Sequence, residues 1–197
     1  MLFEDPIKLD MIDANVVYYP NFFVKNEADA FFNNLLNTIN WKQDTITVFG
    51  KAHLQPRLTA FYANNSNTYK YSNIVMQPNV FNTDLLNIKK AIENELKINF
   101  TSCLANLYRN GKDSNGWHAD DEKELGENPI IASISFGAER MFHFKHRFNK
   151  DLKMKLKLEH GSLLLMKDET QKYWLHQIPK TKKDIGNRIN LTFRIIT

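Results

Sequence analysis

Three residues with metal-binding side chains stand out in the second half of this sequence. His118 and Asp120 form a His-x-Asp pair, and His176 follows much later in the chain. Two imidazoles and one carboxylate are the ligand set of a facial triad, which holds iron(II) on one side and leaves the other side open for a co-substrate and dioxygen. Residues i and i+2 of a strand point the same way, so His118 and Asp120 can bind one ion while the third ligand comes from elsewhere in the fold.

A segment near the end of the chain, residues 188–194, adds groups that can hold a dicarboxylate. As a strand it turns four polar side chains to one face, namely Arg188, Asn190, Thr192 and Arg194. Arginine binds carboxylates through paired, charged hydrogen bonds. Asn106 and Tyr108 repeat this polar face on an earlier segment. A solvated edge strand is the alternative interpretation, but so many polar groups beside three metal ligands favour a co-substrate pocket.

The composition indicates one globular domain. A length of 197 residues, with 43% hydrophobic and 12% aromatic residues, is enough for a single sizeable core. No apolar run approaches the length of a membrane span, and Met1–Asp5 is too acidic and too short for a signal peptide. Cys103 is the single cysteine, which excludes an internal disulfide and indicates a reducing compartment. We expect Cys103 to pack in the core.

The positive charge is modest overall but uneven along the chain. The formal net charge is +4. Basic residues gather in two clusters, one formed by Lys145, His146, Arg147, Lys150, Lys153, Lys155 and Lys157, and the other by Lys180, Lys182 and Lys183. Lysines protect the edge of a sheet from pairing with another chain, and they also contact phosphates in nucleic acids. Charge alone favours the first interpretation.

Helical periodicity precedes strand periodicity along the chain. Apolar spacing predicts helices over 27–38 and 84–96, with Asn26 and Thr83 as their cap residues. Strands are predicted over 100–108, 130–136, 152–158, 161–166 and 188–196. We therefore expect an α+β fold with a double-sheet β core and the N-terminal helices packed outside.

A longer collinear series of motifs runs from about Val48 to Ile195. Its members are Val48-Phe49-Gly50-Lys51, Pro56-Arg57, Tyr69-Lys70-Tyr71-Ser72, Asn106-Leu107-Tyr108, His118-Ala119-Asp120-Asp121-Glu122, Ser133-Ile134-Ser135-Phe136-Gly137, His160-Gly161-Ser162-Leu163-Leu164, Trp174-Leu175-His176 and Arg188-Ile189-Asn190-Leu191-Thr192-Phe193-Arg194. In this series the chain resembles the AlkB family of iron(II)- and 2-oxoglutarate-dependent dioxygenases, and within it the homologues that repair duplex DNA.

The resemblance implies one AlkB-like domain over residues 1–197, with a nucleotide-recognition extension to about residue 98 and a jelly-roll catalytic core (double-stranded β-helix) of two antiparallel sheets from about residue 99. It implies that His118, Asp120 and His176 ligate iron(II). The residues implied to hold 2-oxoglutarate are Asn106, Tyr108, Arg188, Thr192 and Arg194. The implied reaction uses dioxygen to demethylate bases such as 1-methyladenine and 3-methylcytosine in DNA, and it releases succinate, CO2 and formaldehyde.

The two arginines are expected to have different tasks. They lie six residues apart, roughly 20 Å along an extended strand. We therefore expect Arg188 and Arg194 not to clamp the same carboxylate: one should hold the distal carboxylate of 2-oxoglutarate and the other should lie near the iron. The sequence does not indicate which is which.

The resemblance also implies residues that contact the nucleic acid. A base inside a duplex must leave the stack before an enclosed metal centre can reach it. Phe49 resembles a finger that fills the resulting gap, and an ordinary buried strand aromatic is the alternative. Gly50 and Lys51 favour the finger, because Phe-Gly-Lys is typical of a tight turn with a phosphate-binding lysine at its tip.

Five further residues are expected to contact the substrate. Tyr71 resembles the aromatic that stacks on the flipped base, and Tyr69 lies on the same side; half-buried strand tyrosines are the alternative. Asp121 and Glu122 could accept hydrogen bonds from an exocyclic amine of the base, or form an ordinary solvated acidic turn. Arg57, in the Pro56-Arg57 motif, completes the set.

The expected partner is alkylated DNA, with duplex favoured and single strands possible. RNA bases, or a substrate other than nucleic acid, remain open for the same chemistry. A non-catalytic nucleic-acid-binding module is a further alternative, but such a module has no need of the triad and both arginines. We expect a monomer with no membrane attachment, in the cytoplasm of a bacterium or the nucleus of a eukaryote.

Overall fold

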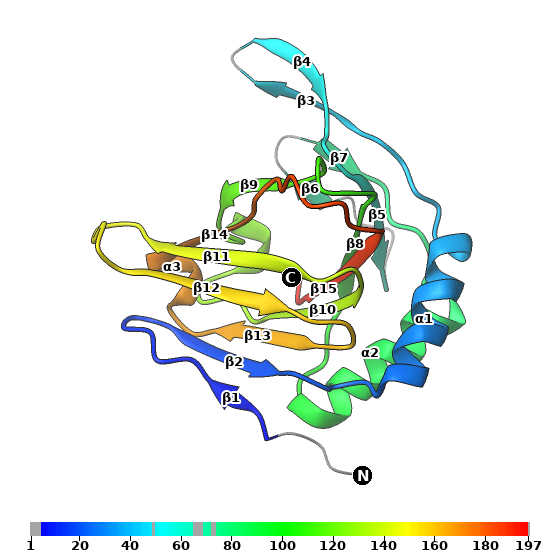
Figure 1. The fold of residues 1–197 in the computed structure, drawn as a ribbon, viewed down its shortest axis with the longest axis horizontal. Coiled ribbons are helices and arrows are strands. Elements are labelled where there is room, and N and C mark those ends of the chain that lie inside the picture. Colours follow the sequence, from blue (N-terminus) through cyan, green and yellow to red (C-terminus); the bar gives the residue numbers. More distant parts are fainter. Residues whose placement is uncertain (1–4, 49, 65–68, 72–73, 197) are drawn as a thin grey trace.

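Two antiparallel sheets face each other in the computed structural model, which describes residues 5–48, 50–64, 69–71 and 74–196 (Figure 1). The large sheet has the order β1 (Ile7–Lys8), β2 (Asn15–Tyr19), β13 (Leu163–Lys167), β10 (Ile131–Gly137), β15 (Arg188–Arg194), β8 (Ser102–Tyr108) and β5 (Leu58–Ala63). The small sheet has the order β12 (Lys153–Leu158), β11 (Arg140–His146), β14 (Trp174–Ile178) and β9 (Asn115–His118). This arrangement confirms the jelly-roll expectation.

Helices α1 (Lys25–Thr38) and α2 (Thr83–Leu96) cover the outside of the large sheet. Leu35 of α1 and Ile88 of α2 are fully buried in a cluster that includes Leu191 and Phe193 of β15. Burying an aliphatic or aromatic side chain of this size contributes about 1.5–3 kcal/mol. The apolar face of β15 therefore lies under the helices, and its polar face is turned to the space between the sheets.

The position of β15 excludes the solvated edge strand. It pairs with β10 on one side and with β8 on the other, and all seven of its residues are buried. A second apolar cluster fills the space between the sheets and includes Leu104, Phe142 and Phe144. Cys103 is buried on the helix side, as expected, and burial raises the pKa of its thiol.

Both predicted helix caps are wrong by one or two residues. Helix α1 begins at Lys25, so Asn26 lies inside its first turn, and no side chain caps it. Helix α2 begins at Thr83, and Asn82 caps it by accepting a hydrogen bond from the Leu85 amide at 2.9 Å. Asparagine is a slightly better cap than threonine because its side-chain oxygen reaches the amides of the first turn.

The expected division near residue 98 does not divide the sheets. Strands β1, β2 and β5 come from the first half of the chain, yet β2 pairs with β13 and β5 pairs with β8 along its whole length. The first half thus supplies three strands of the large sheet as well as the two helices. Periodicity over a few residues predicts that a segment is a strand. It does not indicate the paired strand, which is distant in sequence.

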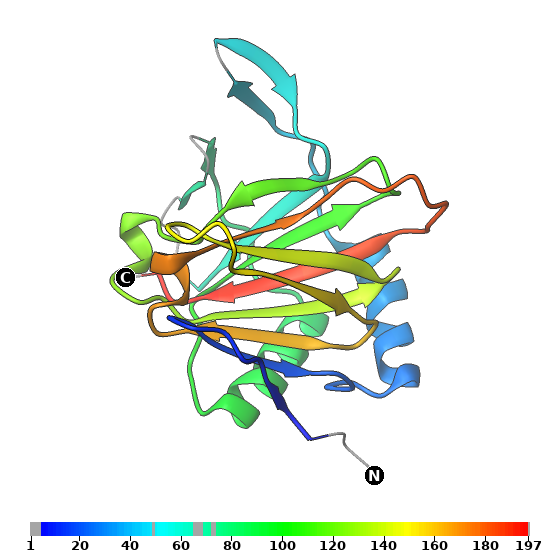
Figure 2. The ribbon, with the colours of Figure 1, turned by 60° about the vertical axis from the view of Figure 1, so that its left-hand side comes forward.

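Two further hairpins, a 3-10 turn and a short helix complete the described elements. They are β3 (Thr45–Val48) with β4 (Lys51–Leu54), β6 (Tyr69–Tyr71) with β7 (Ile74–Met76), the turn at Lys123–Leu125, and α3 (Thr170–Tyr173). The β3–β4 hairpin projects clear of the two sheets (Figure 2). Among the described residues, no helix has the length and apolar character needed to cross a membrane.

Candidate functional site

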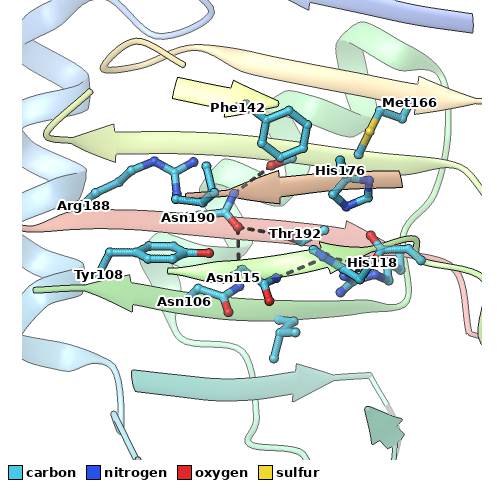
Figure 3. A pocket seen from close by; sticks show the side chains of 15 residues that line it. Asn106, Tyr108, Asn115, His118, Phe142, Met166, His176, Arg188, Asn190 and Thr192 are labelled. Atoms are coloured by element: carbon cyan, nitrogen blue, oxygen red, sulfur yellow. Dashed lines mark hydrogen bonds and ion pairs between the residues drawn. The ribbon is translucent and has the colours of Figure 1, made fainter. Parts of the chain in front are cut away.

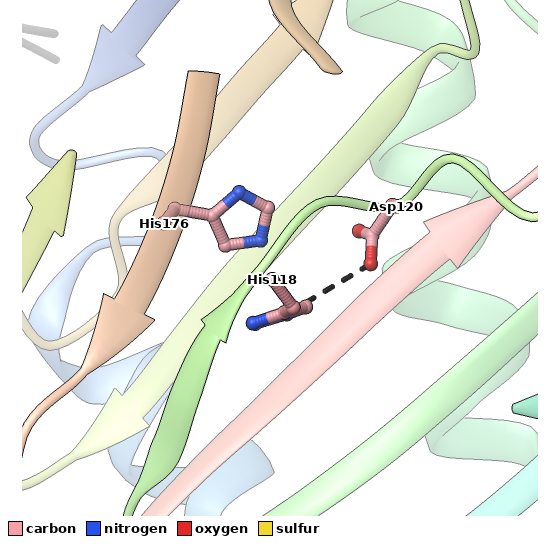
Figure 4. A group of neighbouring side chains, drawn as sticks. All are labelled: His118, Asp120 and His176. Carbon is pink, nitrogen blue, oxygen red and sulfur yellow. Dashed lines mark ion pairs between the residues drawn. The ribbon is translucent and has the colours of Figure 1, made fainter. Parts of the chain in front are cut away.

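The small sheet brings His118, Asp120 and His176 together. His118 is the last residue of β9, Asp120 follows two residues later, and β14 pairs with β9 so that His176 lies opposite His118. One potential ligand atom from each residue lies within 4.8 Å of the other two (Figure 4). The imidazole ring centroids of the two histidines are 4.3 Å apart. These positions suit one metal ion bound from one side.

The environment keeps the three side chains in the protonation state that a metal requires. Burial lowers the pKa of His176 to about 3, and it also lowers the pKa of His118. Burial acts to raise the pKa of Asp120, but Arg194 and the two histidines outweigh it and bring that pKa to about 2. Near pH 7 the cluster therefore offers two neutral imidazoles and one carboxylate.

Neighbouring groups orient the ligands. The Nδ1 atom of His118 lies 2.7 Å from the Gly116 carbonyl oxygen, which can only accept a hydrogen bond. The proton therefore sits on Nδ1, so the lone pair of Nε2, which lies 3.1 Å from Nδ2 of Asn115, is the one that can bind a metal. The backbone amide of Asp120 donates to Oε1 of the buried Gln171 at 3.0 Å. Gln171 carries no motif in the sequence, and only the position of α3 brings it here.

A pocket between the two sheets begins at the metal-binding cluster (Figure 3). Its lining residues are Leu104, Asn106, Tyr108, Asn115, His118, Asp120, Ser133, Phe142, Met166, His176, Ile178, Arg188, Asn190, Thr192 and Arg194. All eight residues predicted to hold the metal or 2-oxoglutarate are therefore in one pocket. The convergence follows from the alternation of β8 and β15, whose polar faces meet side by side because the two strands are paired.

Arg194 and Arg188 lie at opposite ends of this pocket. Nη2 of Arg194 is 3.0 Å from Oδ1 of Asp120, which places this guanidinium at the metal end. Nη2 of Arg188 donates to Oγ of Ser135 at 2.9 Å, and its guanidinium carbon is 5.2 Å from the centre of the Tyr108 ring.

The buried guanidinium of Arg188 has fewer hydrogen bonds than it has donors. It is 1% exposed, and its Nε and Nη1 atoms form no hydrogen bond with any residue in the described part of the chain. Burial lowers its pKa to about 10. Leaving buried guanidinium N–H groups unsatisfied is unfavourable by about 1–3 kcal/mol or more. The residues present thus fit an anionic group bound next to Arg188 and Tyr108.

A hydrogen-bonded network lines the middle of the pocket. Nδ2 of Asn190 donates to Oγ of Ser133 at 2.7 Å, and Oγ1 of Thr192 donates to Oδ1 of Asn190 at 3.0 Å. Asn106 donates to the same oxygen of Asn190 at 3.4 Å. Ser133 and Ser135 belong to one of the motifs in the sequence, but no role was predicted for either. Their i, i+2 spacing on a predicted strand next to a polar face was the available signal.

Arg57 lies against this pocket rather than on an exposed surface. It is 4% exposed, and its Nε donates to Oδ1 of Asn106 at 2.8 Å. This hydrogen bond orients Asn106, and contact of Arg57 with the substrate stays a prediction. The Pro56-Arg57 motif gave no indication of burial, because burial here depends on the pairing of β5 with β8.

The other predicted substrate contacts lie around the metal-binding cluster or on the two hairpins. The carboxylate of Asp121 is half exposed and forms an ion pair with Arg147, while Glu122 is partly buried. Gly50, with φ 74°, and Lys51 are exposed at the turn of the β3–β4 hairpin, as the turn prediction requires. Phe49 lies outside the described residues. Tyr69 and Tyr71 form β6, and their side chains also lie outside the described part.

Comparison with known proteins identifies the class. Residues 15–194 match the model of the 2OG-Fe(II) oxygenase superfamily. A bovine relative named alpha-ketoglutarate-dependent dioxygenase alkB homolog 3 is 43% identical over 93% of this chain, and the chain spans 66% of that relative's length. A human relative named DNA oxidative demethylase ALKBH2 is 36% identical over 90% of this chain and 72% of the relative.

A solved structure shares the fold. The structure titled "The structure of OsALKBH1" superposes with a TM-score of 0.68 at 16% identity, covering 97% of this chain and 100% of that one. The matched family model, the triad and the pocket place this chain in the superfamily of iron(II)- and 2-oxoglutarate-dependent oxygenases. Within that superfamily the chain belongs to the AlkB family.

Proposed function

We propose that this protein oxidatively demethylates N-alkylated bases in DNA, with His118, Asp120 and His176 holding the iron(II). The observation that carries the proposal is the pocket with two neutral imidazoles and the Asp120 carboxylate at one end and the buried, incompletely hydrogen-bonded Arg188 at the other. When bound, iron(II) and 2-oxoglutarate would supply, together with dioxygen, the oxidising power that removes an N-methyl group.

Arg188 and Tyr108 would bind the distal carboxylate of 2-oxoglutarate. The Nε and Nη1 groups of Arg188 offer charged donors to which carboxylate oxygens can bind. Arg194 would keep Asp120 anionic and turned toward the metal, because its guanidinium contacts that carboxylate. Asn106 and Thr192 would complete the polar wall between the two ends.

The hairpins beside the pocket would recognise the nucleic acid. The exposed turn at Gly50 and Lys51 suits contact with a backbone phosphate, and Phe49 beside it would fill the gap left by a flipped base. Tyr69 and Tyr71 would stack on that base, and Asp121 and Glu122 would accept from its exocyclic amine. We favour duplex DNA as substrate, because one relative is named a DNA oxidative demethylase and the finger sequence suits a stacked helix.

The test uses purified protein, iron(II), 2-oxoglutarate and oligonucleotides carrying one 1-methyladenine or 3-methylcytosine. We expect loss of the methyl group by mass spectrometry, together with equal amounts of succinate and formaldehyde. Parallel duplex DNA, single-stranded DNA and RNA substrates reveal the preferred nucleic acid. Conversion of 2-oxoglutarate without demethylation of any of the three would contradict the proposed substrate class. Because the proposed substrate is DNA, we expect this protein where the genome lies, in the bacterial cytoplasm or the eukaryotic nucleus.

A further inference from the structure

The outer face of the small sheet carries basic residues and no acidic ones. The four strands β9, β11, β12 and β14 contain no aspartate or glutamate, although the whole chain has 22. We call the outward-facing residues Trp117, His143, Lys145, Lys153 and Lys155 the basic face. The opposite face of the same strands holds His176 and the apolar cluster between the sheets.

Two lysines lie directly opposite each other on the basic face, and a histidine lies opposite a third lysine. In the β11–β12 pairing, Lys145 is opposite Lys153, and His143 is opposite Lys155. Burial and Lys155 lower the pKa of His143. Opposed like charges destabilise an antiparallel pair by a few tenths of a kcal/mol or more, so this arrangement is not explained by the stability of the sheet.

The lysines of the basic face also differ from their neighbour Lys157. Lys157 forms ion pairs with Glu139 at 3.1 Å and Glu159 at 2.8 Å. No carboxylate among the described residues forms an ion pair with Lys145, Lys153 or Lys155. Their charge is therefore available to a partner.

Trp117 connects the basic face to the edge strand β9, which carries His118 of the metal-binding cluster. It is 39% exposed, lies on the edge strand β9 and immediately precedes His118. The Nζ atom of Lys145 is 4.5 Å from the centre of the Trp117 ring. A cation–π contact of this kind holds the ammonium in place, so Lys145 is ordered at a short distance from the site.

Protection of a sheet edge accounts for only part of this pattern. Lysines on β12, an edge strand, would discourage pairing with another chain. His143 and Lys145 lie on β11, which already has β12 on one side and β14 on the other, and needs no such protection.

We propose that the basic face binds the phosphate backbone of the strand that flanks the target base. This proposal rests on the proposed function, because a base held at the metal leaves its neighbouring nucleotides at the pocket entrance. A strand turning around the edge at β9 reaches Trp117 first, then Lys145, and then Lys153 and Lys155. Such contacts bind by releasing counterions and are independent of base sequence.

The experiment compares two triple variants of the full chain. One carries Lys145→Gln, Lys153→Gln and Lys155→Gln. The matched control carries Lys8→Gln, Lys90→Gln and Lys97→Gln, which removes the same charge from exposed positions on β1, on α2 and just after α2. Affinity for an unmodified 30-nucleotide single-stranded DNA is measured by fluorescence anisotropy over a range of salt concentrations.

We expect the basic-face variant to bind at least about tenfold more weakly at 0.1 M salt, and the slope of log K against log salt to fall by about 2, at about 0.7 per phosphate contact. The control should bind like the unaltered protein. Demethylation of a five-nucleotide substrate should be unchanged in both variants, because so short a strand does not extend onto the face.

Equal affinity of the two variants for the 30-nucleotide strand would overturn the proposal. Aggregation of the basic-face variant with unchanged affinity of its monomeric fraction would also overturn it and leave only edge protection. Binding of an unmodified strand is measured without turnover, so a failure of the proposed demethylation is seen separately. A Lys→Arg version of the basic-face variant keeps the charge and should retain binding.

Discussion

At the scale of single residues, Asp120 is the only anionic group of the metal-binding cluster. We expect Asp120→Ala to reduce iron occupancy and turnover by at least about a hundredfold, because ligand loss exceeds the tenfold to hundredfold effect of losing a supporting group. The variant also leaves Arg194 without its buried partner. Metal content after dialysis and succinate release are the measurements, and Asp151→Ala, at an exposed position outside the pocket, is the matched control. Near-normal iron occupancy in Asp120→Ala would rule out the triad.

The two arginines should respond differently to replacement by lysine, which keeps the charge but loses the planar fork. Arg188→Lys should raise the apparent KM for 2-oxoglutarate by about tenfold or more while iron occupancy stays unchanged. Arg194→Lys should lower iron occupancy as well, because Arg194 contacts Asp120. Titration of 2-oxoglutarate and metal analysis on both variants test this difference, and an identical response of the two would argue against separate tasks.

At the scale of the elements, the connection from β8 to β9 positions His118. Asp113 accepts hydrogen bonds from the backbone amide, Nε and Nη2 of Arg109, at 2.9, 2.8 and 2.9 Å. Burial acts to raise the pKa of Asp113, but these bonds outweigh it and lower the pKa below its usual value. The ionised carboxylate thus stabilises the folded chain.

The lowered pKa of Asp113 predicts the sign of a pH effect. The stabilisation by the ionised Asp113 carboxylate is complete above about pH 4, which is the pKa of an aspartate in an unfolded chain. This stabilisation is lost as the pH falls through the lower pKa that Asp113 has in the folded protein. Asp113→Asn should lower the free energy of unfolding by about 1–3 kcal/mol at pH 7. The variant should also lose less stability in acid than the unaltered protein does. Thermal unfolding at pH 7 and below pH 4 measures both effects. A variant that is no less stable at pH 7 would show that the Arg109–Asp113 contact is dispensable.

At the scale of the whole molecule, the β3–β4 hairpin stands away from the sheets, and we propose that it enters a duplex. We expect Phe49→Ala to lower demethylation of duplex DNA by one to two orders of magnitude, since an aromatic wedge contributes a few kcal/mol. Activity on single-stranded DNA should fall much less, because little ordered stacking must be replaced. Equal losses on both substrates, together with a lower melting temperature, would instead assign Phe49 to the core.

The sequence by itself determined the chemical groups and their local direction. Strand alternation was enough to place Arg188, Asn190, Thr192 and Arg194 on one face, and the i, i+2 spacing joined His118 to Asp120, because both depend only on backbone periodicity. Helices α1 and α2 and five of the strands, β8, β10, β12, β13 and β15, followed from the same periodicity. All eight predicted metal and co-substrate residues consequently lie in one pocket.

Only the tertiary structure decided which distant strands are neighbours, and the remaining differences follow from that. The pairing of β14 with β9 brings His176 opposite His118, and the position of β15 within the large sheet puts Arg194, not Arg188, at the metal. The pairing of β5 with β8 buries Arg57 behind Asn106 and draws the first half of the chain into the sheet. Strand register is set by packing between segments far apart in sequence, and local periodicity does not indicate which strand will be the neighbour.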